Sequence, residues 1–230
     1  DVTMIVLTSD HGDYLGDHWL GEKDLFHDPS VKVPMIVYDP RAQADATRGT
    51  VCDALVEAID LAATFVEAAG GDVPSHILEG RSLMPWLCGE TPDWRSFVIS
   101  EFNYAATGVG DALGLAPKDC RLFMVFDGRW KLVHAEGGFR PMLFDLETDP
   151  QEFVDLAKGD DHQDQIDRLY DMLAEWARRE AQRGTGSDAA IAADSGKSAR
   201  RGILPFLVDG SEVPDELTGH YRGRAPKRPD

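Results

Sequence analysis

The apolar and polar positions at the start of the chain predict two strands separated by a long polar loop. Residues 2–9 (VTMIVLTS) are apolar at odd and even positions alike, which is typical of a strand covered on both faces in a parallel sheet. The polar residues 10–30 predict a loop. A second strand is expected over residues 33–38 (VPMIVY), with Pro34 at its start, where a missing N–H costs least.

A helical period follows these strands. In residues 52–69 apolar side chains recur every three or four positions, and the pattern stops at Gly70-Gly71. Residues 82–87 predict a short helix and residues 96–100 another strand. Strand, loop, strand and helix in this order favour an α/β sheet.

The pattern changes again in the second half of the chain. Residues 121–134 contain two strand-like runs joined by Asp127-Gly128, a strong signal for a type I′ hairpin. Residues 142–146 can supply a third antiparallel strand. The sequence therefore predicts a small antiparallel sheet here.

The clearest helix of the chain is expected directly after this sheet. Its apolar stripe consists of Ile166, Leu169, Tyr170, Leu173, Trp176 and Ala177. Acidic residues precede the stripe and Arg178-Arg179 lie near its end, the charge distribution that the helix dipole favours. The sheet and this helix together predict a second, smaller subdomain.

These patterns divide the chain into three regions. Residues 1–115 form the α/β region, residues 116–182 the antiparallel subdomain, and residues 183–230 a linker and tail. Within the last region, residues 184–202 lack aromatic residues and periodicity, as flexible linkers do.

Composition narrows the choice of partners and compartment. The net charge of −18 argues against a nucleic-acid partner, because phosphate backbones attract basic surfaces. No apolar run approaches the roughly 20 residues that span a bilayer, so no membrane partner is expected. Cys52, Cys88 and Cys120 are an odd number without C-x-x-C spacing. Reduced thiols, and hence the cytoplasm, are favoured, with the periplasm as the alternative.

The segment TSDHGDYLGDH (residues 8–18) places candidate chemistry at the carboxyl end of the first strand, where open α/β sheets bind ligands. A carboxylate oxygen of Asp10 beside an imidazole nitrogen of His11 suits a divalent cation, and Gly12 allows the backbone to turn. Two ligands do not make a site, so a solvated turn is the alternative.

The wider stretch, residues 9–40, resembles the sulfatase branch of the alkaline phosphatase superfamily. The motifs that match are Ser9-Asp10-His11-Gly12, Gly16-Asp17-His18, Lys23, Phe26 and Lys32-Val33-Pro34-Met35-Ile36. Further motifs match in the same order, at residues 60–70, 79–89 and 142–157. The resemblance covers about residues 2 to 180. Within the branch, residues 26–37 and 130–150 are most similar to phosphonate monoester hydrolases and phosphodiesterases.

The resemblance implies a fold and a set of site residues. Residues 1–115 would be the C-terminal portion of an alkaline-phosphatase-like α/β sheet with flanking helices. Asp10 and His11 would bind one divalent metal ion, with Ca, Mn and Zn equally compatible. Lys23 would be catalytic, contacting the substrate's charged oxygens or the leaving-group oxygen. His18, His27 and His134 are candidates for support of the metal or for a substrate pocket, with ordinary structural roles as the alternative.

The nucleophile of this branch is a formylglycine made from Cys or Ser in a C-x-P-x-R motif. None of the three cysteines, and no serine, lies in such a motif. The chain also starts at Asp1 without a methionine and enters a strand at once. We therefore expect a fragment whose formylglycine belongs to a missing N-terminal part. Alone it should be inert, bind metal weakly and expose an aggregation-prone strand edge.

The leading hypothesis is the C-terminal part of a metal-dependent hydrolase acting on small-molecule phosphonate monoesters, phosphodiesters or sulfate esters, in a homo-oligomer. An arylsulfatase proper is one alternative. A non-catalytic interaction or oligomerisation module derived from the same fold is another. A phosphate-transferring relative would need a Thr or Ser nucleophile and further His ligands downstream, and the sequence does not offer them.

Overall fold

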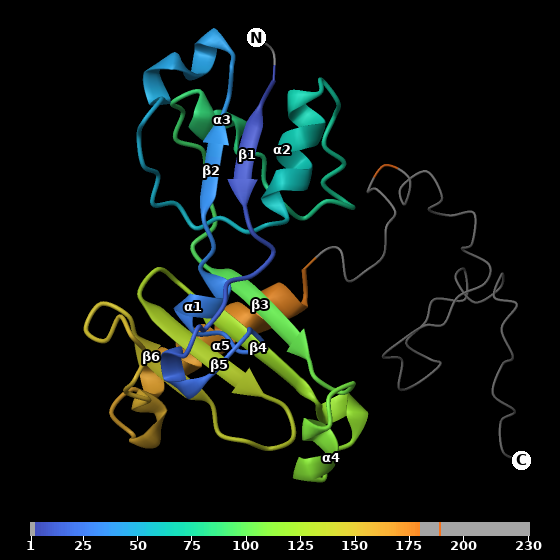
Figure 1. Ribbon diagram of the computed structural model, residues 1–230. Coiled ribbons are helices and arrows are strands. Elements are labelled where there is room, and N and C mark those ends of the chain that lie inside the picture. Colours follow the sequence, from blue (N-terminus) through green and yellow to red (C-terminus); the bar gives the residue numbers. More distant parts are fainter. Residues whose placement is uncertain (1–2, 180–188, 190–230) are drawn as a thin grey trace, which may run out of the picture. The chain divides into compact units, whose positions relative to one another are not determined.

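The computed structural model describes residues 3–179 and residue 189. The chain divides into two units, residues 1–183 and 184–230, and every element below belongs to the first (Figure 1). Apart from residue 189, the linker and tail expected over residues 183–230 lie outside the described residues, and the three predicted domain boundaries remain predictions.

The two strands expected at the start of the chain are present as a two-stranded ribbon. β1 (Ile5–Thr8) pairs with β2 (Met35–Tyr38). The pairing is antiparallel, with Leu7 opposite Ile36, so the expectation of a parallel neighbour is wrong for this pair. The chain reverses direction in the loop between them, which contains the short helix α1 (Asp28–Val31).

A four-stranded antiparallel sheet forms the second part of this unit. Its strands are β3 (Val98–Asn103), β4 (Arg121–Phe126), β5 (Trp130–Ala135) and β6 (Met142–Asp145), in spatial order β3-β4-β5-β6. The three strands expected after residue 120 are confirmed. The strand expected near residues 96–100 joins the same sheet as its edge, a pairing that the sequence pattern did not indicate.

The hairpin between β4 and β5 has the expected position but another turn. Asp127 pairs with Trp130, so Gly128 and Arg129 are the two central residues. Only Gly128 has a positive φ, of 98°, whereas a type I′ turn needs two. The Asp127 carboxylate accepts hydrogen bonds from the backbone N–H groups of Arg129 and Trp130. These bonds stabilise the observed turn.

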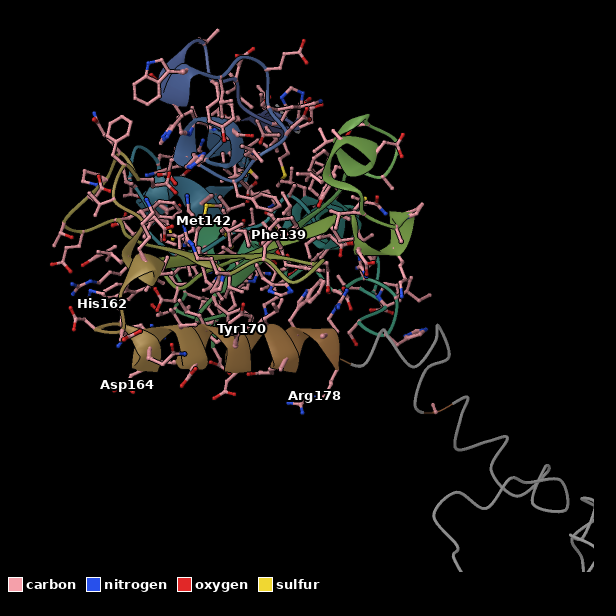
Figure 2. All side chains as sticks on the ribbon, turned by 90° about the horizontal axis from the view of Figure 1, so that it is seen from below. Phe139, Met142, His162, Asp164, Tyr170 and Arg178 are labelled. Carbon is pink, nitrogen blue, oxygen red and sulfur yellow. The ribbon has the colours of Figure 1, made fainter. Side chains whose placement is uncertain are left out.

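Both faces of the four-stranded sheet are buried. The helix expected after the sheet is α5 (Gln163–Ala177), and it covers one face. The core on that side consists of Val125, Leu132, Leu143, Ile166 and Leu169. Figure 2 shows Tyr170 on the sheet side of α5, with Asp164 and Arg178 pointing away from it. On the other face Phe26 packs with Met124 and Val133.

The remaining helices are short. α2 (Asp60–Ala68) begins later than the predicted range of residues 52–69, and α3 (Met84–Leu87) confirms the short helix expected there. Asp60 sets the start of α2, because its fully buried carboxylate accepts the Glu57 N–H and pairs with Arg95. The other helical segments are α4 (Val109–Leu113) and the 3₁₀ turns Asp17–Trp19, Ala42–Thr47, Pro117–Asp119 and Leu156–Lys158. Within the described residues, none of the helices has the length and apolar character to span a bilayer.

Candidate functional site

Asp10 and His11 follow directly after β1 and face each other. The Asp10 Oδ2 and His11 Nε2 atoms lie 3.6 Å apart. His11 Nδ1 lies 2.6 Å from the Gly12 carbonyl oxygen, and because a carbonyl only accepts, Nδ1 must carry the proton. Nε2 lies beside the carboxylate, and it is the ring nitrogen that remains available to bind a metal ion. This arrangement is the one that metal-ligating histidines adopt.

The electrostatic surroundings keep the Asp10 carboxyl ionised. The hydrogen bond from its own backbone N–H, followed by the neighbouring His11, lowers the pKa of Asp10 below its ordinary value. The Lys23 ammonium acts weakly in the same direction. The turn therefore offers a carboxylate oxygen and an imidazole nitrogen side by side in an exposed position.

The chemistry of this donor pair fits a divalent cation, but the pair is only part of a ligand set. Within residues 3–179 there is no cluster of three His, Cys, Asp or Glu side chains that could hold a metal ion. Asp10 and His11 are thus the residues of this chain that would contribute to such a site, as two ligands among several.

Gly12 has a packing role rather than the turning role expected of it. Its N–H donates to the Ser30 carbonyl oxygen at 2.7 Å. A Cβ atom at this position would lie 1.9 Å from the Pro29 carbonyl oxygen, far inside van der Waals contact. The absence of a side chain lets the Asp10–His11 turn lie directly on α1.

Lys23 lies in a loop with an unusual backbone. Leu15, His18, Trp19, Glu22 and Asp24 all have positive φ values, which L-residues with side chains rarely adopt. Such strain persists only where the surroundings enforce it, and it is concentrated at functional sites. The Lys23 side chain is exposed at the end of this segment.

His18 and His27 lie together, as a stacked pair with ring centroids 3.9 Å apart. The Tyr14 hydroxyl is 2.8 Å from His27 Nδ1. Burial, reinforced by the neighbouring His18, lowers the pKa of His27 to about 4, so this ring is neutral at neutral pH. Burial also raises the pKa of Tyr14 to about 12. His27 is thus a neutral ring packed against His18 and Tyr14.

His134 does not lie with these residues. It points to the opposite face of the sheet, where its Nδ1 is 2.9 Å from the Tyr170 hydroxyl of α5. There it lines a groove of about 540 Å³ together with Phe123 and Trp176. The structure therefore separates His134 from Asp10, His11 and Lys23, and a role in a pocket remains a prediction for a different surface.

Sequence reasoning missed a buried ionic cluster next to the site. Lys131 of β5 is 1% exposed and Glu152, after β6, is 3% exposed. Asp28, at the start of α1, lies between them and accepts from Lys131. The only signal in the sequence is a lysine within the mostly apolar run Trp130–Ala135, which does not by itself reveal burial.

Solved structures with a similar fold define the class. The phosphonate monoester hydrolase of Agrobacterium radiobacter matches with a TM-score of 0.69 and 31% identity, covering 76% of this chain and 35% of that one. The phosphonate monoester hydrolase from Silicibacter pomeroyi gives 0.71 and 32%, covering 77% of this chain and 35% of that one. The chain therefore has the fold of the C-terminal part of a sulfatase-type member of the alkaline phosphatase superfamily.

Sequence comparison gives the family. Residues 16–179 match the family model of the N-sulphoglucosamine sulphohydrolase C-terminal region, and the chain belongs to this family. It is 35% identical over 161 residues to the multifunctional alkaline phosphatase superfamily protein PehA of Trinickia caryophylli, covering 68% of this chain and 30% of the relative. It is 28% identical to an arylsulfatase of Clostridium perfringens, covering 74% of this chain and 33% of the relative. The chain spans about a third of the length of these relatives.

The predicted resemblance to sulfatases and phosphonate monoester hydrolases, limited to their C-terminal part, is confirmed. The family match begins at residue 16, so the Asp10–His11 turn precedes the matched region. The assignment of individual site residues consequently rests on the geometry of the turn and on the motif, and it enters the proposal below.

Proposed function

We propose that the protein carrying this chain is a metal-dependent hydrolase of phosphonate monoesters, phosphodiesters or sulfate esters. The observation that carries the proposal is the Asp10–His11 turn, with His11 Nε2 3.6 Å from the Asp10 carboxylate and Nδ1 held by the Gly12 carbonyl oxygen, in a chain of the sulfatase family. Phosphoryl and sulfuryl esters gain negative charge in the transition state, and a bound divalent cation would stabilise that charge.

The residues of this chain would have distinct roles. Asp10 and His11 would contribute two ligands to one divalent ion, Ca, Mn or Zn. Lys23 would contact the charged oxygens of the substrate or the leaving-group oxygen, where a fixed ammonium stabilises the developing charge. A formylglycine nucleophile and further ligands would come from outside the described residues, and the relatives are about three times as long as this chain.

Phosphonate monoesters are the substrate class we favour. The two phosphonate monoester hydrolases are 31% and 32% identical to this chain, whereas the arylsulfatase is 28% identical. Sulfate esters are the second class; both esters are monoanions at neutral pH, and they differ in whether a phosphonyl or a sulfuryl group is transferred. Kinetic comparison of a phosphonate monoester with an aryl sulfate bearing the same leaving group distinguishes them.

We further propose a cytoplasmic homo-oligomer whose partner is a small-molecule ester. Cys52, Cys88 and Cys120 are all free thiols, as expected of a reducing compartment. The apolar face of the β1–β2 ribbon is exposed in the isolated chain, and such a face suits contact with further protein. Gel filtration coupled to light scattering measures the assembly.

The decisive experiment compares two aspartates of the same loop in the natural protein. Asp10→Asn should reduce hydrolysis about 100-fold or more by removing an anionic ligand, and chelation should abolish hydrolysis. Asp17→Asn removes the same charge from an exposed side chain in the same loop and should leave the rate unchanged. Full activity of Asp10→Asn or of the chelated enzyme would refute the metal-dependent mechanism, and an inactive natural protein would favour the non-catalytic module.

A further inference from the structure

We propose that Lys131 and Glu152 are positioning residues of this site, acting through α1 on the Asp10–His11 turn and on Lys23. This inference rests on the proposed function. The two residues lie more than one hundred positions from the turn in sequence, on or next to the four-stranded sheet. Their role would explain why a hydrolase needs this sheet beside its site.

Lys131 is the centre of the cluster. Its Nζ lies 2.7 Å from Asp28 Oδ1 and 2.7 Å from Glu152 Oε1, and it donates to the Phe26 carbonyl oxygen at 3.1 Å. Phe26 lies just before α1, Asp28 is its first residue, and Glu152 accepts the Asp28 backbone N–H. The contacts with Phe26 and Asp28 are hydrogen bonds, and the contact with Glu152 Oε1 is an ion pair.

Glu152 holds the first turn of α1 from the other side. Its Oε2 accepts the Asp28 backbone N–H at 2.6 Å. Glu152 has a φ of 58°, a conformation that is strained for a residue with a side chain. The backbone is thus held in an unfavourable form where the carboxylate reaches both Lys131 and α1.

α1 carries this constraint to the candidate site by two routes. The Ser30 carbonyl oxygen accepts the Gly12 N–H at 2.7 Å, one residue from His11, and Gly12 lies in contact with Pro29. On the other side, His27 is bonded to Tyr14, and Phe26 lies three residues after Lys23. Displacing α1 would therefore move both candidate ligands and Lys23.

Stability alone is a poor explanation for such a cluster. Replacing a buried ion pair with apolar residues of similar volume is often neutral or stabilising, because desolvation offsets most of the Coulomb attraction. Breaking the pair by removing one partner is destabilising, since the other charge remains buried. An apolar pair could match the net stability of the cluster. It could not form the directed hydrogen bonds that fix the position of α1.

This distinction defines the test, made in the natural protein. Lys131→Met leaves Glu152 buried without its partner, so stability and kcat should both fall. The double variant Lys131→Met/Glu152→Met should regain the wild-type unfolding midpoint to within about 5 °C. Its kcat should stay about tenfold or more below wild type, because a displacement on the order of 1 Å is enough for such a loss. A double variant with both stability and kcat restored would overturn the proposal.

Hydrogen exchange supplies a readout that does not depend on catalysis. In the double variant the Gly12 amide should exchange about tenfold faster, since its bond to Ser30 depends on α1. Amides in α5 should be unchanged. Unchanged Gly12 exchange would overturn the proposal even if the protein had no hydrolase activity, so failure of the positioning role and failure of the proposed function are distinguishable.

Two further variants complete the design. Lys32→Met is the matched control: Lys32 also faces Asp28, at 3.4 Å, but its side chain is 78% exposed, so kcat and Gly12 exchange should not change. Asp28→Asn is a milder variant, for use if the double variant fails to fold. Asp28 is partly exposed, and its substitution weakens only one contact of Lys131. It should lower kcat about threefold or more and speed Gly12 exchange, and the absence of both effects would contradict the role.

Discussion

His27 shows how the site keeps a titratable side chain neutral. Its ring is stacked on His18 and bonded to Tyr14, and its pKa is lowered to about 4. The unfolded chain binds a proton at the ordinary histidine value near 6.5. Between these two values the unfolded state carries more protons than the folded state, so stability increases with pH in this window.

We therefore expect the free energy of unfolding to fall as the pH is lowered from about 6.5 to about 4, by about 1 to 3 kcal/mol from this residue. His27→Gln, which cannot take up the proton, should show a correspondingly flatter profile. Chemical denaturation across this pH range measures both. If the free energy of unfolding of the wild type and of His27→Gln had the same pH dependence, the lowered pKa of His27 would be contradicted.

Residue chemistry was predictable from the sequence only where it is local. Asp10 and His11 adjoin the end of a strand, which made them candidate ligands, and the resemblance of the wider segment implied the ligand role. Their ligation of a metal remains a proposal. Lys131 could not be found in this way. A period of two assigns it to one face of β5, but its burial depends on Phe26 and α1, which are distant in sequence.

At the scale of elements, two sequence motifs are joined by side chains. The Asp60 carboxylate at the start of α2 accepts the Arg81 N–H, and Thr64, one turn later, accepts the Leu83 N–H. Gly80 lies against the Ile59 carbonyl oxygen, which would be 2.1 Å from a Cβ. The segments 60–70 and 79–89 therefore fold as one unit around α2 and α3.

Gly80→Ala should destabilise the protein by about 2 kcal/mol or more, because the new methyl group meets backbone atoms that cannot move independently. Gly108→Ala is the matched control, since its φ is −69° and no atom lies within 4 Å of the added Cβ. Thermal unfolding of the two variants measures the difference. Equal midpoints would show that this segment adjusts without cost.

The start of α2 illustrates what a hydrophobic period leaves out. Apolar residues recur with helical spacing from residue 52, yet residues before Asp60 are not helical. Glu57 donates its N–H to Asp60 and its carboxylate accepts the Ile99 N–H. The first contact is local, whereas the second joins Glu57 to a residue distant in sequence, which a hydrophobic period does not report.

At the scale of the described unit, the β1–β2 ribbon exposes a continuous apolar face. Leu7 is paired with Ile36 and Ile5 with Tyr38, and all four side chains are exposed. Contiguous apolar surface and free strand edges promote association between chains. The expected exposure of apolar strand faces is confirmed, whereas aggregation remains a prediction.

The isolated chain should therefore self-associate at micromolar concentration, and Leu7→Lys/Ile36→Glu should suppress this, because the new cross-strand ion pair replaces apolar surface. The double substitution Val109→Lys/Leu113→Glu makes the same exchange on α4, where both residues are also exposed, and serves as the control. Sedimentation velocity measures the species present. Equal association in both variants would locate the contact elsewhere.

Strand direction and sheet membership were the parts of the fold that pattern could not supply. The pattern of apolar residues along a strand does not tell whether the neighbouring strand runs parallel or antiparallel to it. The loop between β1 and β2 is long enough for both directions. The edge position of β3 depends on pairing across the segment before β4. The hairpin and the helix α5, which are encoded by neighbouring residues, were placed nearly as observed.

The contact between Gly12 and Pro29 bears on how such chains can diverge. Because a Cβ at position 12 would overlap the Pro29 carbonyl oxygen, a side chain can appear there only where α1 is shifted or shortened. We expect a side chain at position 12 to occur in natural variants only together with a changed length or path of the segment that contains α1. The glycine of the Asp-His-Gly triplet would then mark the presence of α1, while the two preceding residues mark the chemistry.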